Sequence, residues 1–230
     1  MNISQSYLPC FPGNRPDVSR APLTLLVTGF GPFPGAPRNP SAAILRALSG
    51  ATERRLARLG VTLECHELPV VFAEAEARIA SLLQAHAPDA VLHLGLAGRR
   101  KSLGVEWQAR NRLAAYPDAQ RQRPLARQVL KAAPEFRRAR VPVAQLVTTL
   151  RACGARAEFS RDAGAYVCNQ TLYLTLGATV ALAGFIHVPR PRGRLPLHRV
   201  KQPRIALATM VQAIAAALVL LARHARQSRQ

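Results

Sequence analysis

One cysteine and one histidine stand at the expected ends of two neighbouring elements. Cys168 follows Tyr166-Val167, which can end a short strand, and precedes a stretch that can begin a helix. The free amides at a helix N-terminus favour the thiolate, which is the nucleophilic form of cysteine. His187 ends an apolar, partly β-branched run that is typical of a buried strand. The pair indicates a cysteine nucleophile that is activated by a histidine base.

A third side chain is needed, because a catalytic imidazole must be oriented through its second ring nitrogen. Glu106 can accept that hydrogen bond. It lies in the segment 98–116, where alternating apolar residues suit a strand or a hairpin excursion. Structural interpretations compete with catalysis at all three positions: a core cysteine, a hydrogen-bonded histidine at a strand end and an exposed glutamate on a hairpin.

The surrounding chain alternates strand and helix patterns, which predicts βαβ units. The expected strands cover residues 23–28, 61–70, 90–94, 155–159 and 179–186, and the expected helices cover 39–48, 72–86, 143–150, 169–176 and 205–221. These elements predict a single α/β domain with a central mixed sheet and helices on both faces. Functional side chains of such sheets collect at the carboxyl ends of the strands.

The chain has 230 residues, of which 49% are hydrophobic, and this length suits one domain with a full core. Its net charge is +20, from 32 Lys+Arg against 12 Asp+Glu. The densest basic stretch, Arg121 to Arg140, contains Phe136 as its single aromatic residue. Binders of single-stranded nucleic acid interleave cations with stacking rings. We therefore expect a solvated loop and no specific nucleic-acid partner.

Four scattered cysteines without a CxxC pair predict neither a disulfide scaffold nor a metal site, and they suit a reducing cytoplasm. Residues 1–22 are expected to be a disordered extension, 23–224 the α/β domain and 225–230 a polar tail. The alanine-rich run 205–221 favours a buried amphipathic helix over a membrane span.

The remaining histidines lack a catalytic context. His93 precedes a glycine-containing run, which favours a structural hydrogen bond over chemistry. The simplest interpretation of the others is a place on the surface: His66, His86, His198 and His224.

Four blocks of sequence, in order, resemble those of pyroglutamyl peptidase I, also called pyrrolidone-carboxylate peptidase. The blocks are LVTGFGPFPGAPRNPS from Leu26, LPVVFAE from Leu68, PDAVLHLGLAGRRKSLGVEWQARN from Pro88, and AGAYVCNQTLYL from Ala163 with AGFIHVP from Ala183. The resemblance extends over most of the chain, from about Leu23 to Val188.

This resemblance implies a three-layer αβα fold with a mostly parallel sheet, and a cysteine peptidase that removes pyroglutamate from the N-terminus of peptides. Residue by residue, it implies catalytic roles for Cys168, His187 and Glu106. Phe30 and Phe33 resemble the rings that enclose the pyroglutamate ring, while Tyr166 and Val167 would supply the pocket wall and backbone contacts. No cofactor, metal or membrane is implied, and family members commonly form tetramers.

The chain departs from the family pattern around its glutamate. Arg99 replaces a glycine that could require an unusual backbone angle. An arginine associated with substrate or oxyanion binding has no clear counterpart, so Arg110 and Arg112 are candidates to compensate. These changes and the high positive charge leave an alternative open, a catalytically impaired family member that acts as a basic binding protein.

Overall fold

The computed structural model describes residues 22–191 and 205–229. Residues 1–21 of the expected extension, and His198, lie outside the described part of the chain. In chain order the elements are β1 (Leu23–Phe30), α1 (Pro40–Leu48), α2 (Ala51–Ala57), β2 (Val61–Leu68), α3 (Phe72–His86), β3 (Ala90–Leu96), β4 (Leu103–Glu106), β5 (Gln108–Arg110), β6 (Phe136–Arg138), α4 (Val143–Ala152), β7 (Ala157–Ser160), α5 (Val167–Gly177), β8 (Leu182–Val188) and α6 (Leu207–Gln227).

The main sheet has six strands in the order β2-β1-β3-β8-β4-β7. The first four are parallel to one another, β4 is antiparallel to β8, and β7 is parallel to β4. This is the expected mixed, mostly parallel sheet. Strands β5 and β6 form a separate antiparallel pair. The carboxyl ends of β1, β3 and β8 therefore meet at one edge of the main sheet, as expected of a site-bearing edge.

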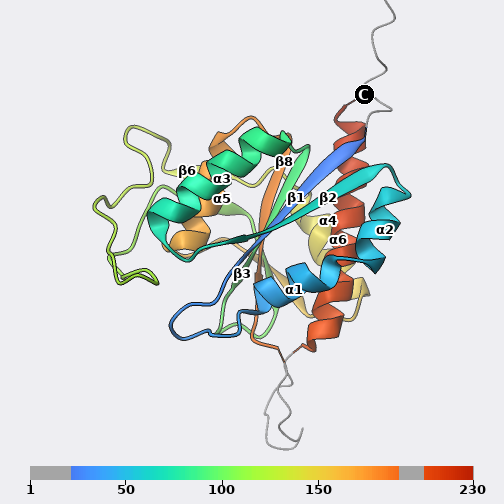
Figure 1. The fold of residues 1–230 in the computed structure, drawn as a ribbon, viewed down its shortest axis with the longest axis horizontal. Helices are drawn as coiled ribbons and strands as arrows, with labels where there is room; N and C mark the ends of the chain where they lie inside the picture. Colours follow the sequence, from blue (N-terminus) through green and yellow to red (C-terminus); the bar gives the residue numbers. More distant parts are fainter. Residues whose placement is uncertain (1–21, 192–204, 230) are drawn as a thin grey trace, which may run out of the picture.

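Helices cover both faces of this sheet and bury its apolar side chains in two cores (Figure 1). On one face, α1, α2, α4 and α6 pack around residues such as Ile44, Leu146 and Leu218. On the other face, α3 and α5 pack around residues such as Ile79 and Tyr173. The three-layer αβα prediction is confirmed.

Local signals in the sequence set several helix boundaries. The Asn39 side chain accepts a hydrogen bond from the Ser41 amide at 3.1 Å, and Pro40 begins α1. An asparagine cap followed by proline satisfies one free amide and supplies a preset backbone angle, which is why this start could be predicted. Helix α3 ends at Ala87, whose φ of 39° is left-handed and turns the chain toward β3.

Helix α6 is long and apolar enough to cross a membrane by length and composition alone. It packs instead beside α1 and α4, where it buries residues including Met210, Ile214 and Leu218. The expected amphipathic core helix is confirmed. It continues to Gln227, so the first residues of the expected polar tail are helical.

Two local expectations were wrong. No strand ends at Tyr166-Val167; the preceding strand is β7, and a loop then leads directly into α5 at Val167. Glu106 lies on a strand, as one of the two alternatives expected, but the strand is no excursion, because β4 inserts into the main sheet between β8 and β7. Both errors concern pairing between distant segments, which local periodicity does not report.

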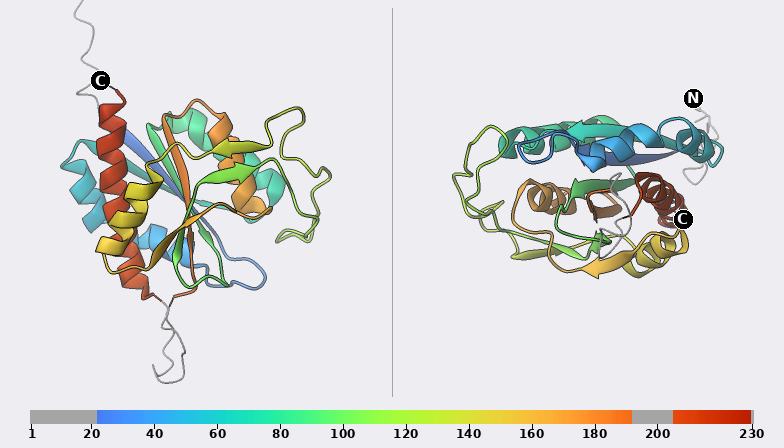
Figure 2. Two further views of the ribbon diagram at one scale, coloured as in Figure 1. Left: turned by 180° about the vertical axis from the view of Figure 1, so that it is seen from behind. Right: turned by 90° about the horizontal axis from the view of Figure 1, so that it is seen from below.

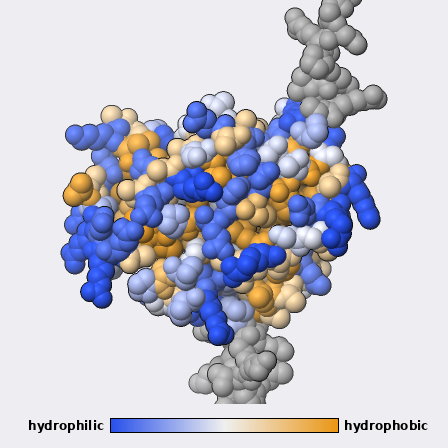
Figure 3. All heavy atoms as spheres, in the orientation of Figure 1, coloured by the Kyte–Doolittle hydropathy of each residue, from blue (hydrophilic) through white to orange (hydrophobic). Residues whose placement is uncertain are grey.

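The basic stretch before α4 forms an extended loop that leads into β6 and stands away from the body of the molecule (Figure 2). Hydrophilic residues gather over this side (Figure 3). Its early arginines, Arg121, Arg123 and Arg127, are exposed as expected. Arg137 and Arg140 depart from the solvated-loop expectation, because both are partly buried and donate hydrogen bonds to carbonyl groups of α5.

Candidate active site

A buried hydrogen bond joins two of the three predicted catalytic side chains. His187 Nδ1 lies 2.7 Å from Glu106 Oε1. Glu106 has no solvent exposure, and His187 is 6% exposed. The antiparallel pairing of β4 with β8 produces this contact, since Gly104 and His187 are partners in register and Glu106 follows two residues later on the same face. With Nδ1 as the donor, Nε2 is left as the basic nitrogen of a neutral imidazole.

Cys168 lies in the first turn of α5, directly after the first helical residue, Val167. Its Sγ approaches β3 so closely that a Cβ added at Gly95 would come within 2.9 Å of it. Gly95 is the register partner of His187 on β8. The missing side chain at Gly95 therefore makes the room in which the thiol sits against the sheet edge.

Cys168 and His187 open into one cleft of about 590 Å³. The loop after β3, from Leu96 to Arg100, forms one wall, and the loop before α5, residues 162–166, forms another. The cleft thus lies at the carboxyl ends of β3 and β8, which is where ligands bind in open α/β sheets.

The thiol itself differs from the sequence expectation. Cys168 is partly exposed as a residue. Burial of its thiol nevertheless raises the pKa to about 12, and the charge of Glu106 acts in the same direction. The Cys168 backbone amide opposes the shift by hydrogen bonding. The expectation of a lowered pKa was therefore wrong for the protein without substrate, because desolvation outweighs the contribution of the helix terminus.

Arg100 is a site residue that sequence reasoning missed. Its guanidinium lines the cleft and donates to Glu106 Oε1 at 3.0 Å. A second nitrogen donates to Ser160 Oγ at 2.9 Å. A Cβ at Gly104 would occupy the place of this guanidinium, so glycine leaves the room in which Arg100 reaches Glu106. The sequence has arginine at both 99 and 100, and it does not indicate which of the two side chains contacts Glu106.

Arg110 and Arg112, the two arginines suggested by the sequence, lie outside the cleft. Arg110 places its guanidinium over the Phe136 ring at 5.7 Å, and Arg112 lines a separate hollow beside Tyr116. Neither lines the cleft of Cys168 and His187. Arg99 is not among the described non-glycine residues with positive φ, so its substitution for glycine causes no backbone strain of that kind.

Asn169 is another positioning group that the sequence did not reveal. Its side chain is buried and accepts from the Arg110 amide at 2.8 Å, while its Nδ2 donates to the Arg110 and Arg112 carbonyl oxygens. These bonds attach the end of β5 and the residues just after it to the helical turn that carries Cys168. Such buried, fully used amide groups restrict the position of that turn.

The predicted substrate-binding residues are divided between the core and the surface. Phe30 is 2% exposed and Val167 is completely buried, so both belong to the core on the α3 and α5 face. Tyr166 lines the cleft and also a neighbouring hollow that contains Phe33. Its hydroxyl donates to the Pro117 carbonyl at 3.0 Å, which fixes the ring between the two hollows.

His93 has the structural role expected from its sequence context. It is completely buried, with Nδ1 2.7 Å from Thr28 Oγ1 and Nε2 2.9 Å from Thr175 Oγ1. Burial lowers its pKa to about 3, so the ring is neutral at physiological pH.

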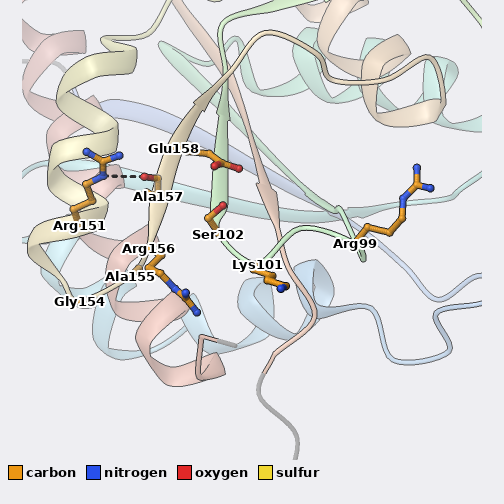
Figure 4. A pocket seen from close by; sticks show the side chains of 9 residues that line it. All are labelled: Arg99, Lys101, Ser102, Arg151, Gly154, Ala155, Arg156, Ala157 and Glu158. Atoms are coloured by element: carbon orange, nitrogen blue, oxygen red, sulfur yellow. Dashed lines mark hydrogen bonds between the residues drawn. The ribbon is translucent and has the colours of Figure 1, made fainter. Parts of the chain in front are cut away.

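A larger hollow of about 740 Å³ lies beside β7 and α4 (Figure 4). Its lining includes Arg99, Lys101 and Arg151, but none of the predicted catalytic residues. Figure 4 shows Arg99 turned away from the others, so the cations do not converge on one point. The smaller cleft is the candidate active site because it holds a thiol beside an oriented imidazole.

Comparisons with known proteins agree with this geometry. The sequence model of the family described as "Pyroglutamyl peptidase" matches residues 23–224. A pyrrolidone-carboxylate peptidase of Gloeobacter violaceus is 38% identical over 207 residues, covering 86% of this chain and 97% of that protein. One from Pseudomonas fluorescens is 36% identical over 201 residues, covering 85% and 91%.

Solved structures show the same fold. The crystal structure of pyroglutamyl peptidase I from Bacillus amyloliquefaciens has a TM-score of 0.76 at 27% identity, covering 88% of this chain and 98% of that one. The pyrrolidone carboxyl peptidase from Thermococcus litoralis has a TM-score of 0.78 at 28% identity, covering 90% and 96%. With a buried Glu106–His187 pair and Cys168 opening into one cleft of this shared fold, the chain belongs to the pyroglutamyl peptidase family of cysteine peptidases.

Proposed function

We propose that this enzyme hydrolyses the amide bond after an N-terminal pyroglutamate, with Cys168 as nucleophile, His187 as general base and Glu106 as the group that orients His187. The observation that carries the assignment is the 2.7 Å contact between His187 Nδ1 and Glu106 Oε1 in a cleft that also contains Cys168. The basic-binding-protein alternative is not favoured, because a purely binding protein has no need for this buried pair.

In the first half-reaction, His187 Nε2 takes the thiol proton as Sγ attacks the carbonyl carbon of the scissile amide. The raised pKa of Cys168 means that proton removal accompanies attack, since little thiolate is present beforehand. The imidazolium then donates that proton to the departing amine, and a thioester remains on Cys168. Glu106 stabilises the transient positive charge without accepting the proton.

In the second half-reaction, water attacks the thioester carbonyl while His187 Nε2 accepts its proton. The carbon–sulfur bond breaks, Sγ regains the proton and free pyroglutamate leaves. The free backbone amides in the first turn of α5 would stabilise the oxyanion in both steps. Arg100 fixes the position of the Glu106 carboxylate through the 3.0 Å ion pair.

For the substrate ring, we propose a position between Tyr166 and Phe33, whose two hollows adjoin. A neutral five-membered lactam offers apolar faces with one N–H and one C=O, which suits an aromatic wall with few polar groups. Phe30 and Val167 would support this pocket from the core beneath it.

The experiment is the release of a fluorescent amine from a pyroglutamyl amide, with the matching prolyl amide as the substrate control. Prolyl amide has a charged ring nitrogen and lacks the lactam oxygen, so it should not be cleaved. Cys168→Ala should abolish release, whereas the matched variant Cys153→Ala should retain it. Equal cleavage of both amides, or full activity of Cys168→Ala, would refute the proposal.

We also propose a cytoplasmic enzyme that associates into homo-oligomers and has no specific nucleic-acid or membrane partner. Trp107 and Phe159 support association, because they form an exposed aromatic pair with ring centroids 5.1 Å apart. Light scattering of the purified protein tests this point. A mass equal to one chain at micromolar concentration would contradict it.

A further inference from the structure

A cluster of two histidines and one glutamate lies outside the catalytic cleft, where β2 packs against the end of α3. Its members are Glu64, His66 and His86. The Nε2 atom of His66 lies 3.5 Å from Glu64 Oε2, and the Nδ1 atom of His86 lies 3.9 Å from the same oxygen. The potential donor atoms of all three side chains lie within 4.8 Å of one another.

The fold itself creates this arrangement. Glu64 and His66 are two residues apart on β2, so their side chains share one face of the strand. The intervening Cys65 packs against the opposite core. Helix α3 covers the shared face and ends at His86, which places the second imidazole over the pair. The two histidine rings have centroids 5.1 Å apart.

We propose that these three side chains form a divalent transition-metal site, with Zn²⁺ as the ion it suits best. Zinc accepts imidazole nitrogen and carboxylate oxygen at about 2.0–2.2 Å in tetrahedral geometry, which separates donor atoms by roughly 3.3–3.5 Å. The 3.5 and 3.9 Å separations need only small side-chain adjustments to reach that geometry. Water would complete the fourth position.

The burial of the donors favours a metal over a simple ion pair. His66 Nε2 is shielded from solvent and makes no well-formed hydrogen bond, because its 3.5 Å contact with Glu64 Oε2 is long. Coordination to a metal would satisfy this buried ring nitrogen more completely than the long contact does. The three side chains keep 22–31% exposure, which leaves an open path for an ion. Two imidazoles exclude Mg²⁺ and Ca²⁺ as preferred ions, because those cations take oxygen ligands.

The electrostatic surroundings limit the expected affinity. Glu64 supplies one negative charge, but Arg78 of α3 is close enough to His66 to act on it electrostatically. None of the three donors lines the catalytic cleft. The metal would therefore act structurally, by joining the edge strand β2 to α3. Helix α3 in turn holds α5 through the 3.1 Å hydrogen bond from Gln170 to Glu76.

The test uses full-length, untagged protein carrying Cys168→Ala, which removes the active-site thiol as a competing ligand. Zn²⁺ is titrated by competition with a chromophoric chelator, and Co²⁺ is used as a spectroscopic probe. We expect one bound ion per chain, a Co²⁺ spectrum without thiolate charge-transfer bands, and a Tm increase of roughly 5–10 °C at a hundredfold excess over Kd.

In that background, His86→Ala and Glu64→Gln should each weaken Zn²⁺ binding by about tenfold or more and remove the Tm increase. His224→Ala is the matched control, because His224 is a partly exposed histidine near the end of α6 and is not one of the three donors, and it should bind as the parent does. Because both His86→Ala and Glu64→Gln are measured, a folding defect in one of them does not decide the outcome. Unchanged affinity in both, or a Co²⁺ spectrum dominated by thiolate bands, would overturn the proposal.

Arg78→Gln provides an independent test, because this substitution should strengthen Zn²⁺ binding instead of weakening it. Removing a positive charge near His66 should tighten Zn²⁺ binding by a few-fold, with a smaller effect at high salt. Weaker binding in this variant would count against the assigned position of the metal.

Discussion

At the scale of single residues, the active site depends on burial more than on the identity of its catalytic groups. Glu106 is fully buried, yet it carries contacts to two groups that can be cationic, His187 and Arg100. A buried carboxylate without such partners would be protonated and could not orient an imidazolium. The same burial keeps Cys168 as a thiol until a base removes its proton.

Glu106→Gln should lower kcat for the pyroglutamyl amide by on the order of 10²-fold or more and leave KM nearly unchanged. The amide cannot stabilise the imidazolium, but the substrate pocket is intact. Steady-state kinetics separate the effect on kcat from the effect on KM. Glu158→Gln, on the exposed face of β7, is the control and should behave as wild type. An unchanged kcat in Glu106→Gln would remove Glu106 from the mechanism.

Alkylation of Cys168 by iodoacetamide should accelerate steadily from pH 7 to pH 10. The thiolate is the reactive form, and its fraction grows tenfold per pH unit as long as the pH stays below the raised pKa of about 12. Labelling rates can be followed by mass spectrometry of the native protein. A rate that is already constant between pH 6 and pH 8 would show a preformed thiolate–imidazolium pair instead.

At the scale of elements, the two ends of α5 have different supports. Its N-terminus carries Cys168 and is attached to Arg110, the last residue of β5, through Asn169. Its C-terminus is covered by Arg140, which donates to the carbonyl oxygens of Leu176, Ala178 and Val180. Cations at a helix C-terminus satisfy free carbonyl groups and complement the helix dipole.

Arg140→Ala should therefore lower the free energy of unfolding by about 2 kcal/mol, since several partly buried, charge-assisted hydrogen bonds are lost together. Urea denaturation measures the effect. Arg123→Ala, in the exposed part of the same basic stretch, is the matched control and should change stability by less than about 0.5 kcal/mol. Equal effects of the two substitutions would show that only net charge matters.

At the scale of the whole molecule, a buried polar chain links three elements through the middle of the sheet. His93 on β3 contacts Thr28 on β1 and Thr175 on α5. Its folded-state pKa of about 3 lies below the ordinary value of 6.5. The unfolded state therefore binds a proton first as the pH falls, and stability is lost between about pH 6.5 and pH 3.

We expect His93 to contribute up to about 1.4 kcal/mol of destabilisation per pH unit in that window. His93→Gln should be less stable at pH 7, but its free energy of unfolding should depend less steeply on pH below 6. Urea midpoints collected at several pH values measure both slopes. The carboxylates shared by both proteins cancel in the comparison, so parallel slopes would contradict the buried neutral histidine.

The sequence by itself determined the elements that local chemistry specifies. The Asn39-Pro40 cap, the apolar spacing in 72–86 and 143–150, and the buried strands near 23–28 and 90–94 lie close to the observed boundaries. The resemblance blocks pointed to Cys168, His187 and Glu106 as the candidate catalytic residues because each stands within a distinctive run of neighbours. These signals are contained in contiguous residues, so they could be read without knowing the fold.

The tertiary structure decided what depends on distant segments. It placed Glu106 in the main sheet through the pairing of β4 with β8, and it selected Arg100 over Arg110 and Arg112 as the arginine that bonds Glu106. It also brought His86 of α3 to the β2 histidine, although their spacing in sequence suggested no ligand set. Long-range pairing, burial and the resulting pKa of Cys168 arise only when the chain is packed, because desolvation and contact depend on neighbours far away in sequence.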